Sequence, residues 1–307
     1  MTTTCDIVIF MSDTIEKKKK KVSFSQYSGW FKCPHSWYLN YLKGLRVYEA
    51  SLNTCFGDAI HDTLQNYIKT LYTEGHEVAD QINLIKDFQD NFRKYVDENK
   101  DKLKYTEDEY TDFLFDGEDI LKTFSASATR IKHFPSKKYE FIGIELPIEI
   151  DIKNNVEFIA YVDLILKDKT TGKYKIWDFK TSSLGWNKYQ LADESKYSQL
   201  LIYKAFYSKK FNVPLDMIEV EFFILKRKLL ENVSFPQSRI QIFEPAHGKQ
   251  SITKSINNFV QFIDECFTAE GSYNEEGYFP KVPGKAKKNC KYCSHYKTNC
   301  NGKEDKD

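Results

Sequence analysis

The order of apolar and polar positions along the chain predicts a first half made of helices. The segment that opens at Ser23 places aromatic and aliphatic residues at helical spacing and predicts a short helix that ends near Gly44. Apolar residues at three- and four-residue intervals over 56–72 predict a second helix with one buried face. From Asp80 to Lys132 the sequence predicts further charge-rich helices.

Strand-like patterns follow. Three segments that are rich in β-branched and aromatic residues and separated by turn signals predict neighbouring strands in a meander, over 140–150, 154–168 and 172–182. The residues 194–211 return to helical periodicity, and 217–228 predicts another strand. A helix and a cysteine-rich end are expected from Asn257 onward. The chain is therefore expected to form an α/β core in which helices flank a mixed sheet.

Composition adds limits to this picture. The chain has 307 residues, of which 41% are hydrophobic, so it can bury a sizeable core. Its 45 basic and 44 acidic residues nearly cancel, and a surface for a polyanion must come from local clustering. The lysine run 17–21 is interpreted as part of a disordered basic tail over 1–22. No segment resembles a signal peptide or a membrane span, so we expect a soluble cytoplasmic protein.

Two acids and a lysine in the predicted strands form a candidate catalytic centre. Asp163 lies among apolar residues, where a carboxylate costs several kcal/mol unless an ion or partner compensates it. Asp178 and Lys180 are two positions apart, so both side chains emerge on one face of a strand. An Asp-x-Lys pair by itself is more often an exposed ion pair. The neighbouring Asp163 favours a Mg²⁺ site with an adjacent ammonium group.

Other side chains fit the same centre. Gln199 and Tyr203 are four residues apart on one face of a predicted helix. His61 follows Gly57 by four residues, and a neutral imidazole near carboxylates can add a metal ligand. A histidine in such a position is, however, more often a residue of the helix surface or the core.

The ordered segments GDAIH, AYVD, DFKT and QLLIY resemble the RecB-like branch of the PD-(D/E)XK nucleases, over roughly residues 23–300. This branch includes the CRISPR-associated RecB-like exonucleases and the nuclease domains of AddAB complexes. The resemblance implies a restriction-endonuclease-like core with helical additions. It implies Mg²⁺ or Mn²⁺ ligands at His61, Asp163 and Asp178, and catalytic or orienting roles for Lys180, Gln199 and Tyr203.

Two further positions enter through the resemblance. Glu145 matches a less strict acidic position of the family, and Ala160 departs from the glycine that is common three residues before the first aspartate. A single nuclease domain is expected over 23–307. Its parts are a helical region at 23–135, a catalytic core at 136–235, and a C-terminal helix with the cysteine region at 236–307.

The cysteines predict a second metal centre. Of seven cysteines, Cys290, Cys293 and Cys300 are spaced for a thiolate site that holds zinc or an iron–sulfur cluster, and a fourth ligand is needed. The resemblance implies Cys33 as that ligand and a [4Fe-4S] cluster that ties the ends of the chain together. Zinc, with either Cys33 or His295 as the fourth ligand, is the alternative. No metal spacing involves the remaining Cys5, Cys55 and Cys266.

The function expected from these features is a metal-dependent DNA exonuclease of recombination, repair or replication, including those of phages. Single-stranded DNA or DNA ends are the expected substrate, and a helicase or recombination protein is a candidate partner. The 20 tyrosines and 23 phenylalanines permit base stacking, and the basic loop 281–288 could contact phosphates. The competing hypotheses are a structure-specific endonuclease or resolvase with the same centre and a non-catalytic DNA-binding scaffold.

Overall fold

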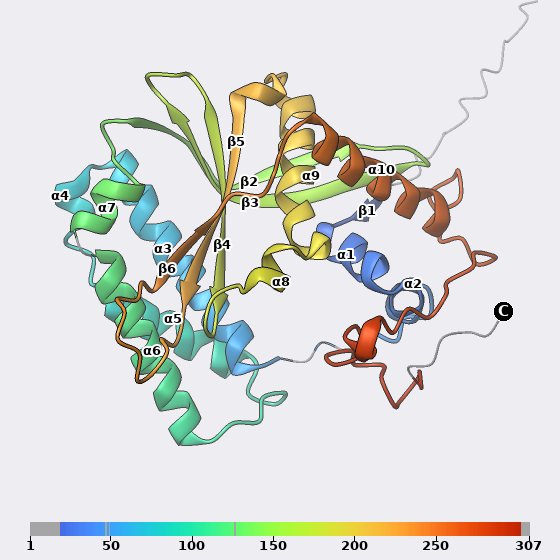
Figure 1. Cartoon of the computed structure of the whole chain (residues 1–307), viewed down its shortest axis with the longest axis horizontal. Helices are drawn as coiled ribbons and strands as arrows, with labels where there is room; N and C mark the ends of the chain where they lie inside the picture. Colours follow the sequence, from blue (N-terminus) through green and yellow to red (C-terminus); the bar gives the residue numbers. More distant parts are fainter. Residues whose placement is uncertain (1–18, 47, 49, 126, 302–307) are drawn as a thin grey trace, which may run out of the picture.

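A computed structural model of the protein describes residues 19–46, 48, 50–125 and 127–301. A mixed sheet lies between two groups of helices, as predicted (Figure 1). Among the described residues no helix is long and apolar enough to cross a membrane. The strands are β1 (Lys20–Val22), β2 (Tyr139–Asp151), β3 (Val156–Asp168), β4 (Tyr174–Ser182), β5 (Ile218–Lys226) and β6 (Ile240–Phe243).

The helices come from two parts of the chain. Those of the N-terminal part are α1 (Phe24–Lys32), α2 (Pro34–Trp37), the π-helix η1 (Tyr38–Leu42), α3 (Leu52–Thr73), α4 (His76–Ala79), α5 (Leu84–Glu98), α6 (Glu107–Ser125) and α7 (Ser127–His133). Those that follow the central strands are α8 (Lys188–Leu191), α9 (Glu194–Phe211), the 3₁₀-helices η2 (Leu215–Met217) and η3 (Lys285–Lys287), and α10 (Lys249–Cys266).

The strand order is β1-β3-β4-β5-β6, and β2 pairs with β3 along almost its whole length. The meander of β2, β3 and β4 is antiparallel, as the sequence predicted. β5 then pairs with β4 in parallel, which requires the crossover through α9. The sheet is mixed for this reason.

An apolar core lies on each face of the sheet. On one face, α1, α9 and α10 pack aromatic rings against β3, and Phe259 contacts both Tyr27 and Phe158. On the other face, α3 and α5 bury Phe56 and Phe88 with their ring centroids 5.5 Å apart. Burial of these rings is the main stabilising contribution to both layers.

The end of the predicted basic tail is part of the fold. Residues 1–18 lie outside the described residues, but Lys20–Val22 forms β1 and pairs in parallel with the start of β3. Val22 is completely buried, and Lys21 Nζ lies 3.1 Å from a carboxylate oxygen of Glu149. The assignment of these three residues to the tail was therefore wrong, because acidic neighbours compensate the lysines and the sheet buries the valine.

The first predicted helix is interrupted. α1 ends at Lys32, Cys33 is extended with φ −161° and ψ 102°, and a new helix starts at Pro34. A proline disfavours helical conformation in the residue before it, and its own fixed φ suits the first position of a helix. The C-terminal helix also differs from the prediction, because α10 begins at Lys249 rather than near Asn257.

A pair of glycine substitutions tests the packing of the helical layer. A Cβ on Gly117 in α6 would lie 2.2 Å from the buried Phe88 ring, whereas a Cβ on Gly29 in α1 would meet nothing within 4 Å. Overpacking costs about 1–3 kcal/mol, more than the ~1 kcal/mol that alanine contributes in a helix interior. We expect Gly117→Ala to lower the free energy of unfolding in urea and Gly29→Ala to raise it slightly. Equal stabilisation by both would contradict the contact between α5 and α6.

Candidate active site

The candidate site lies where β3 and β4 separate. The two strands pair over only four residue pairs, and Leu164 opposite Trp177 is the last of them. Beyond that pair β4 follows β5 to its end, while β3 stays with β2 (Figure 1). Asp163 and Asp178 are the first residues past the last pair, and the Phe179 N–H donates to Asp163 Oδ2 over 2.7 Å. The structure thus brings the two predicted acids together at the point where β3 and β4 separate, which we call the fork.

Lys180 lies beside Asp178 on the same face of β4. Its Nζ is 2.6 Å from Asp178 Oδ2, and the Asp178 side chain is 3% exposed. Apart from this ion pair, the buried Oδ2 accepts no hydrogen bond of good geometry from the described residues. A buried carboxylate oxygen in this state is costly without a further positive partner.

His61 reaches the fork from α3. Its Nδ1 lies 3.7 Å from Asp163 Oδ2, and its ring meets Phe179 edge to face. Gly57, one turn earlier on α3, allows a close approach to β4, because a Cβ there would lie 3.3 Å from Thr181 Oγ1. The GDAIH segment therefore serves both helix packing and the placement of the imidazole.

Glu145 faces the same centre from β2. The register places it opposite Asp163, between the pairs Ile144–Leu164 and Leu146–Val162. Its backbone is left-handed with φ 48°, which is uncommon for a residue with a side chain. Gln65 on α3 donates a 2.6 Å hydrogen bond to its carboxylate. Sequence reasoning missed Gln65, although its place four residues after His61 puts both on one helix face.

Gln199 and Tyr203 complete the site from α9. The two residues lie on one helix face, as their spacing predicted, and Gln199 Nε2 donates to the Tyr203 hydroxyl over 3.1 Å. Tyr203 is 6% exposed. Burial and the charge of Asp178 raise the pKa of Tyr203, so its hydroxyl keeps a proton at neutral pH.

Burial controls the electrostatics of the fork. It raises the pKa of Asp163 and of Asp178 to about 6, even though Lys180 acts in the opposite direction on both. Burial acts to lower the pKa of Lys180, but the charges of Asp178 and Asp163 outweigh it and raise the pKa. Burial and Lys180 lower the pKa of His61 and favour a neutral imidazole. Perturbed groups of this kind concentrate at functional sites.

The donor set at the fork has the chemistry of a divalent metal site. Two carboxylates and a neutral imidazole converge, and one carboxylate oxygen lacks a hydrogen bond. Even so, among residues 19–301 that the structure describes, no three His, Cys, Asp or Glu side chains are arranged to hold an ion as they stand. Lys180 and the Phe179 N–H take the carboxylate oxygens instead. These oxygens would have to exchange partners when an ion binds.

The four predicted cysteine ligands line one small cavity, although they come from opposite ends of the chain. Cys33 lies between α1 and α2, and its Sγ accepts a weak bond from the Val282 N–H at 3.4 Å. The other three follow η3. His295 is 1% exposed, and its ring nitrogens lie 3.0 and 3.1 Å from Asn40 and Asn299. His295 lines the same cavity, and as they stand these cysteines and the histidine, like the rest of the described residues, are not arranged to hold an ion.

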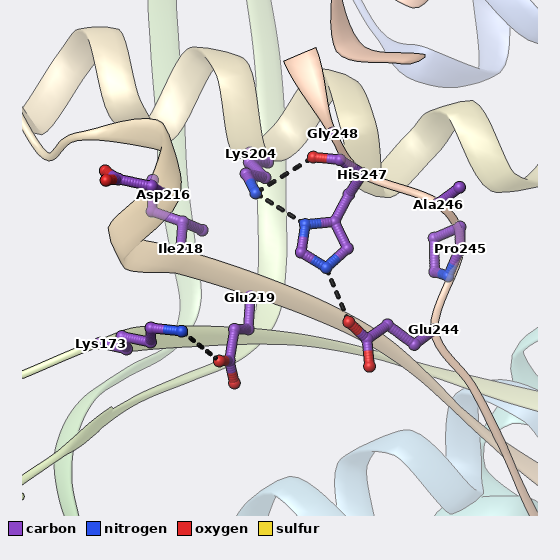
Figure 2. A pocket seen from close by; sticks show the side chains of 10 residues that line it. All are labelled: Lys173, Lys204, Asp216, Ile218, Glu219, Glu244, Pro245, Ala246, His247 and Gly248. Carbon is purple, nitrogen blue, oxygen red and sulfur yellow. Dashed lines mark hydrogen bonds and ion pairs between the residues drawn. The ribbon is translucent and has the colours of Figure 1, made fainter. Parts of the chain in front are cut away.

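A separate depression of about 580 Å³ lies at the start of β4 and β5, away from the fork (Figure 2). Within it Lys204 Nζ lies 2.7 Å from His247 Nδ1, and His247 Nε2 lies 2.7 Å from a Glu244 oxygen. Figure 2 shows these groups joined to one another, with Lys173 paired to Glu219 beside them. None of the predicted site residues lines this depression.

Comparisons with known proteins bear on the whole domain. The family model of the PD-(D/E)XK nuclease superfamily matches residues 21–301. No curated protein matches the chain. A solved structure from Eubacterium rectale, described as a candidate exonuclease, is 11% identical with a TM-score of 0.45 and covers 83% of this chain and 82% of its own. The structure of SSO0001 is 12% identical with a TM-score of 0.29 and covers 88% and 90%. Neither structural likeness bears on activity.

The raised pKa values of Asp163 and Asp178 predict that the free energy of unfolding depends on pH. The folded-state pKa of Asp163 and Asp178 is about 6, above the ordinary 3.8, so the folded protein binds more protons than the unfolded chain between these values. Stability from this pair is therefore lost as pH rises from about 4 to 6. We expect a variant with Asp163→Asn and Asp178→Asn to gain stability relative to the parent over this range, by on the order of 2 kcal/mol.

This comparison is made by urea unfolding of both proteins without divalent ions, at about pH 4.5 and pH 7.5. Using the difference between the two proteins cancels the other titrating groups. A difference that does not change with pH would show that the carboxylates are not desolvated.

Proposed function

The chain belongs to the PD-(D/E)XK nuclease superfamily, and from this premise we propose that it is a DNA exonuclease that hydrolyses phosphodiester bonds with Mg²⁺ or Mn²⁺. The observation that carries the proposal is the convergence of Asp163, Asp178 and Lys180 at the strand fork. These three groups stay together in a buried setting, where an ion pair without a functional use is seldom worth its desolvation cost. A non-catalytic DNA-binding scaffold would have no use for these three charged groups that could offset this desolvation cost.

Asp163 and Asp178 would hold the divalent ion, with His61 beside them as the nitrogen ligand. A bound ion would polarise the phosphate and make a water molecule more acidic. Because the two carboxylates come from different strands, the fork fixes their separation before any ligand binds. The backbones of the two acids would then stay in place on ion binding, and only the partners of their carboxylate oxygens would change.

Lys180 would stabilise the charge that develops on the attacked phosphate. Its raised pKa keeps the ammonium group protonated at neutral pH, and its side chain is 32% exposed, so it can reach a bound substrate. If Asp178 bound an ion, its ion pair with Lys180 would weaken, and the Lys180 ammonium group would become available to the phosphate. Gln199 holds Tyr203 by its hydroxyl oxygen, which leaves the tyrosine proton free to donate into the site.

We also propose a branch of the superfamily, a substrate and a cellular role for this nuclease. The ordered motifs support the RecB-like branch and a substrate of single-stranded DNA or DNA ends. A role in cytoplasmic recombination, repair or replication, with a helicase or recombination protein as partner, follows from the same likeness. The second candidate, a structure-specific endonuclease or resolvase, shares the centre and differs in substrate.

The four cysteines support a [4Fe-4S] cluster that closes the domain. They line a common cavity between the α1–α2 junction and the C-terminal segment. Burial and the neighbouring thiols raise the pKa of Cys290, and Cys293, Cys300 and Cys33 all contribute to this shift. A positive metal centre would remove the repulsion among four thiolates. Zinc on the same four ligands is the alternative occupant.

Substitution of Lys180 tests the catalytic proposal. We expect Lys180→Ala to lower the rate of metal-dependent cleavage by at least about 100-fold, because it removes a charged group aimed at the transition state. The matched control is Lys173→Ala, which removes an exposed lysine next to β4 and should leave the rate within about twofold.

The substrates are a 5′-labelled single strand and a branched duplex with closed ends, each with Mg²⁺ or Mn²⁺. Stepwise shortening of the single strand supports an exonuclease, and incision of the closed branched duplex supports the second candidate. Cleavage by Lys180→Ala as fast as by the parent would refute the assigned centre.

The cluster is tested by anaerobic purification. We expect a brown protein with broad visible absorption and about four irons per chain. Cys290→Ser and Cys33→Ser should each lose the colour, whereas Cys55→Ser, at a buried thiol with no metal spacing, should keep it. A colourless parent with one zinc per chain would overturn the iron–sulfur assignment and leave the nuclease proposal standing.

A further inference from the structure

The segment at the end of β4, residues 182–191, is held in place by several hydrogen bonds, and we call it the ledge. Gln241 on β6 holds Trp186 from both sides of its backbone: its Oε1 accepts from the Trp186 N–H at 2.7 Å and its Nε2 donates to the carbonyl at 2.9 Å. Ser182 Oγ donates to the Gly185 carbonyl across the turn. Gly185 has φ +85°, a conformation that favours glycine. The ledge is therefore fixed only a few residues beyond Lys180.

Trp186 anchors the ledge to the sheet and to α9. Its ring lies 5.0 Å from the Phe222 ring and is 8% exposed. Lys196, in the first turns of α9, places its ammonium group 4.9 Å from the centroid of the indole. This cation–π contact fixes a positive charge next to the ledge.

Two apolar side chains nevertheless project from this rigid surface into solvent. Tyr189 is 75% exposed and Leu184 is 54% exposed. Tyr189 lies in α8, whose first turn is capped by Asn187, and the neighbouring Lys188 lies 5.1 Å from its ring. Rigid presentation of an exposed ring lowers the entropy cost of stacking a flat ligand on it.

Three lysines, Lys32, Lys180 and Lys196, lie near one another beside the ledge. α1 and α9 are in contact there, since Ser28 Oγ donates to the Ser195 carbonyl over 3.0 Å, and α1 ends at Lys32. Burial lowers the pKa of Lys196, and the nearby charges of Lys32 and Lys180 add to that effect. The opposing Asp193 is engaged by the hydroxyl and amide of Ser195 at the start of α9. A ligand that is flat and negatively charged fits this surface.

We propose that the ledge holds a single DNA strand next to the scissile phosphate, with a base stacked on Tyr189 and a neighbouring phosphate bound by Lys196. The inference rests on the proposed nuclease function and names a binding surface for it outside the catalytic fork. Stacking on one ring needs an unpaired base, so duplex DNA does not use this contact. The ledge thereby selects single strands over duplex.

The test measures binding rather than cleavage. In an Asp178→Asn background, the affinity for a labelled oligothymidylate of about 12 nucleotides is measured by fluorescence anisotropy, beside a blunt duplex. We expect Tyr189→Ala to weaken binding of the single strand about 5- to 100-fold and Tyr189→Phe to change it less than about twofold. Affinity for the duplex should stay the same. The control for loss of an exposed ring is Phe115→Ala on α6, 62% exposed.

Lys196 is tested through salt dependence. Lys196→Gln should reduce the slope of log affinity against log salt by about 1, and Lys209→Gln, near the far end of α9, should leave it unchanged. Unchanged single-strand affinity in Tyr189→Ala overturns the ledge, as does a parent that binds no single strand. If the ring dependence holds but the intact protein cleaves no DNA, the nuclease proposal fails and the ledge stands.

Discussion

The arrangement of the candidate site depends on the separation of β3 from β4 after the pair Leu164–Trp177. A sheet that continued its pairing would place Asp163 and Asp178 side by side in a closed ladder, with no room for a phosphate between the strands. Because β4 leaves to follow β5, the two acids stand at an opening that is held from both sides. The Phe179 N–H that binds Asp163 links the two strands directly across this opening.

The same fork makes the charged groups depend on the two helical layers. α3 brings His61 and Gln65 from one face, and α9 brings Gln199 and Tyr203 from the other. Both layers exclude water from the acids, which raises their pKa and makes their charged forms costly without a positive partner. Lys180 supplies part of that compensation, and a divalent ion would supply the rest. The fold therefore destabilises the charged carboxylates, and a bound metal ion would offset that free-energy cost.

Local sequence patterns were enough to predict the central strands and the residues on them. Alternation in the β2–β4 region fixed which side chains share a face, so Asp178 and Lys180 were found without the structure. Other features depend on distant contacts. β1 consists of the last two residues of the lysine run and Val22, and it forms a strand only because it pairs with the edge of β3 and Glu149 lies beside Lys21. Two further features follow from no periodicity in the sequence. They are the left-handed backbone of Glu145 and the two hydrogen bonds between Gln241 and the backbone of Trp186.

The position of a bound metal tests the central claim most directly. A crystal of the protein soaked in Mn²⁺ and measured at the manganese edge should show an anomalous peak between Asp163 and Asp178, with oxygens of both carboxylates within about 2.3 Å of the ion. Lys180 should then have moved away from Asp178 Oδ2 toward the solvent side of the fork. A peak elsewhere, for example in the depression around Lys204 and Glu244, with none at the fork, would contradict the account.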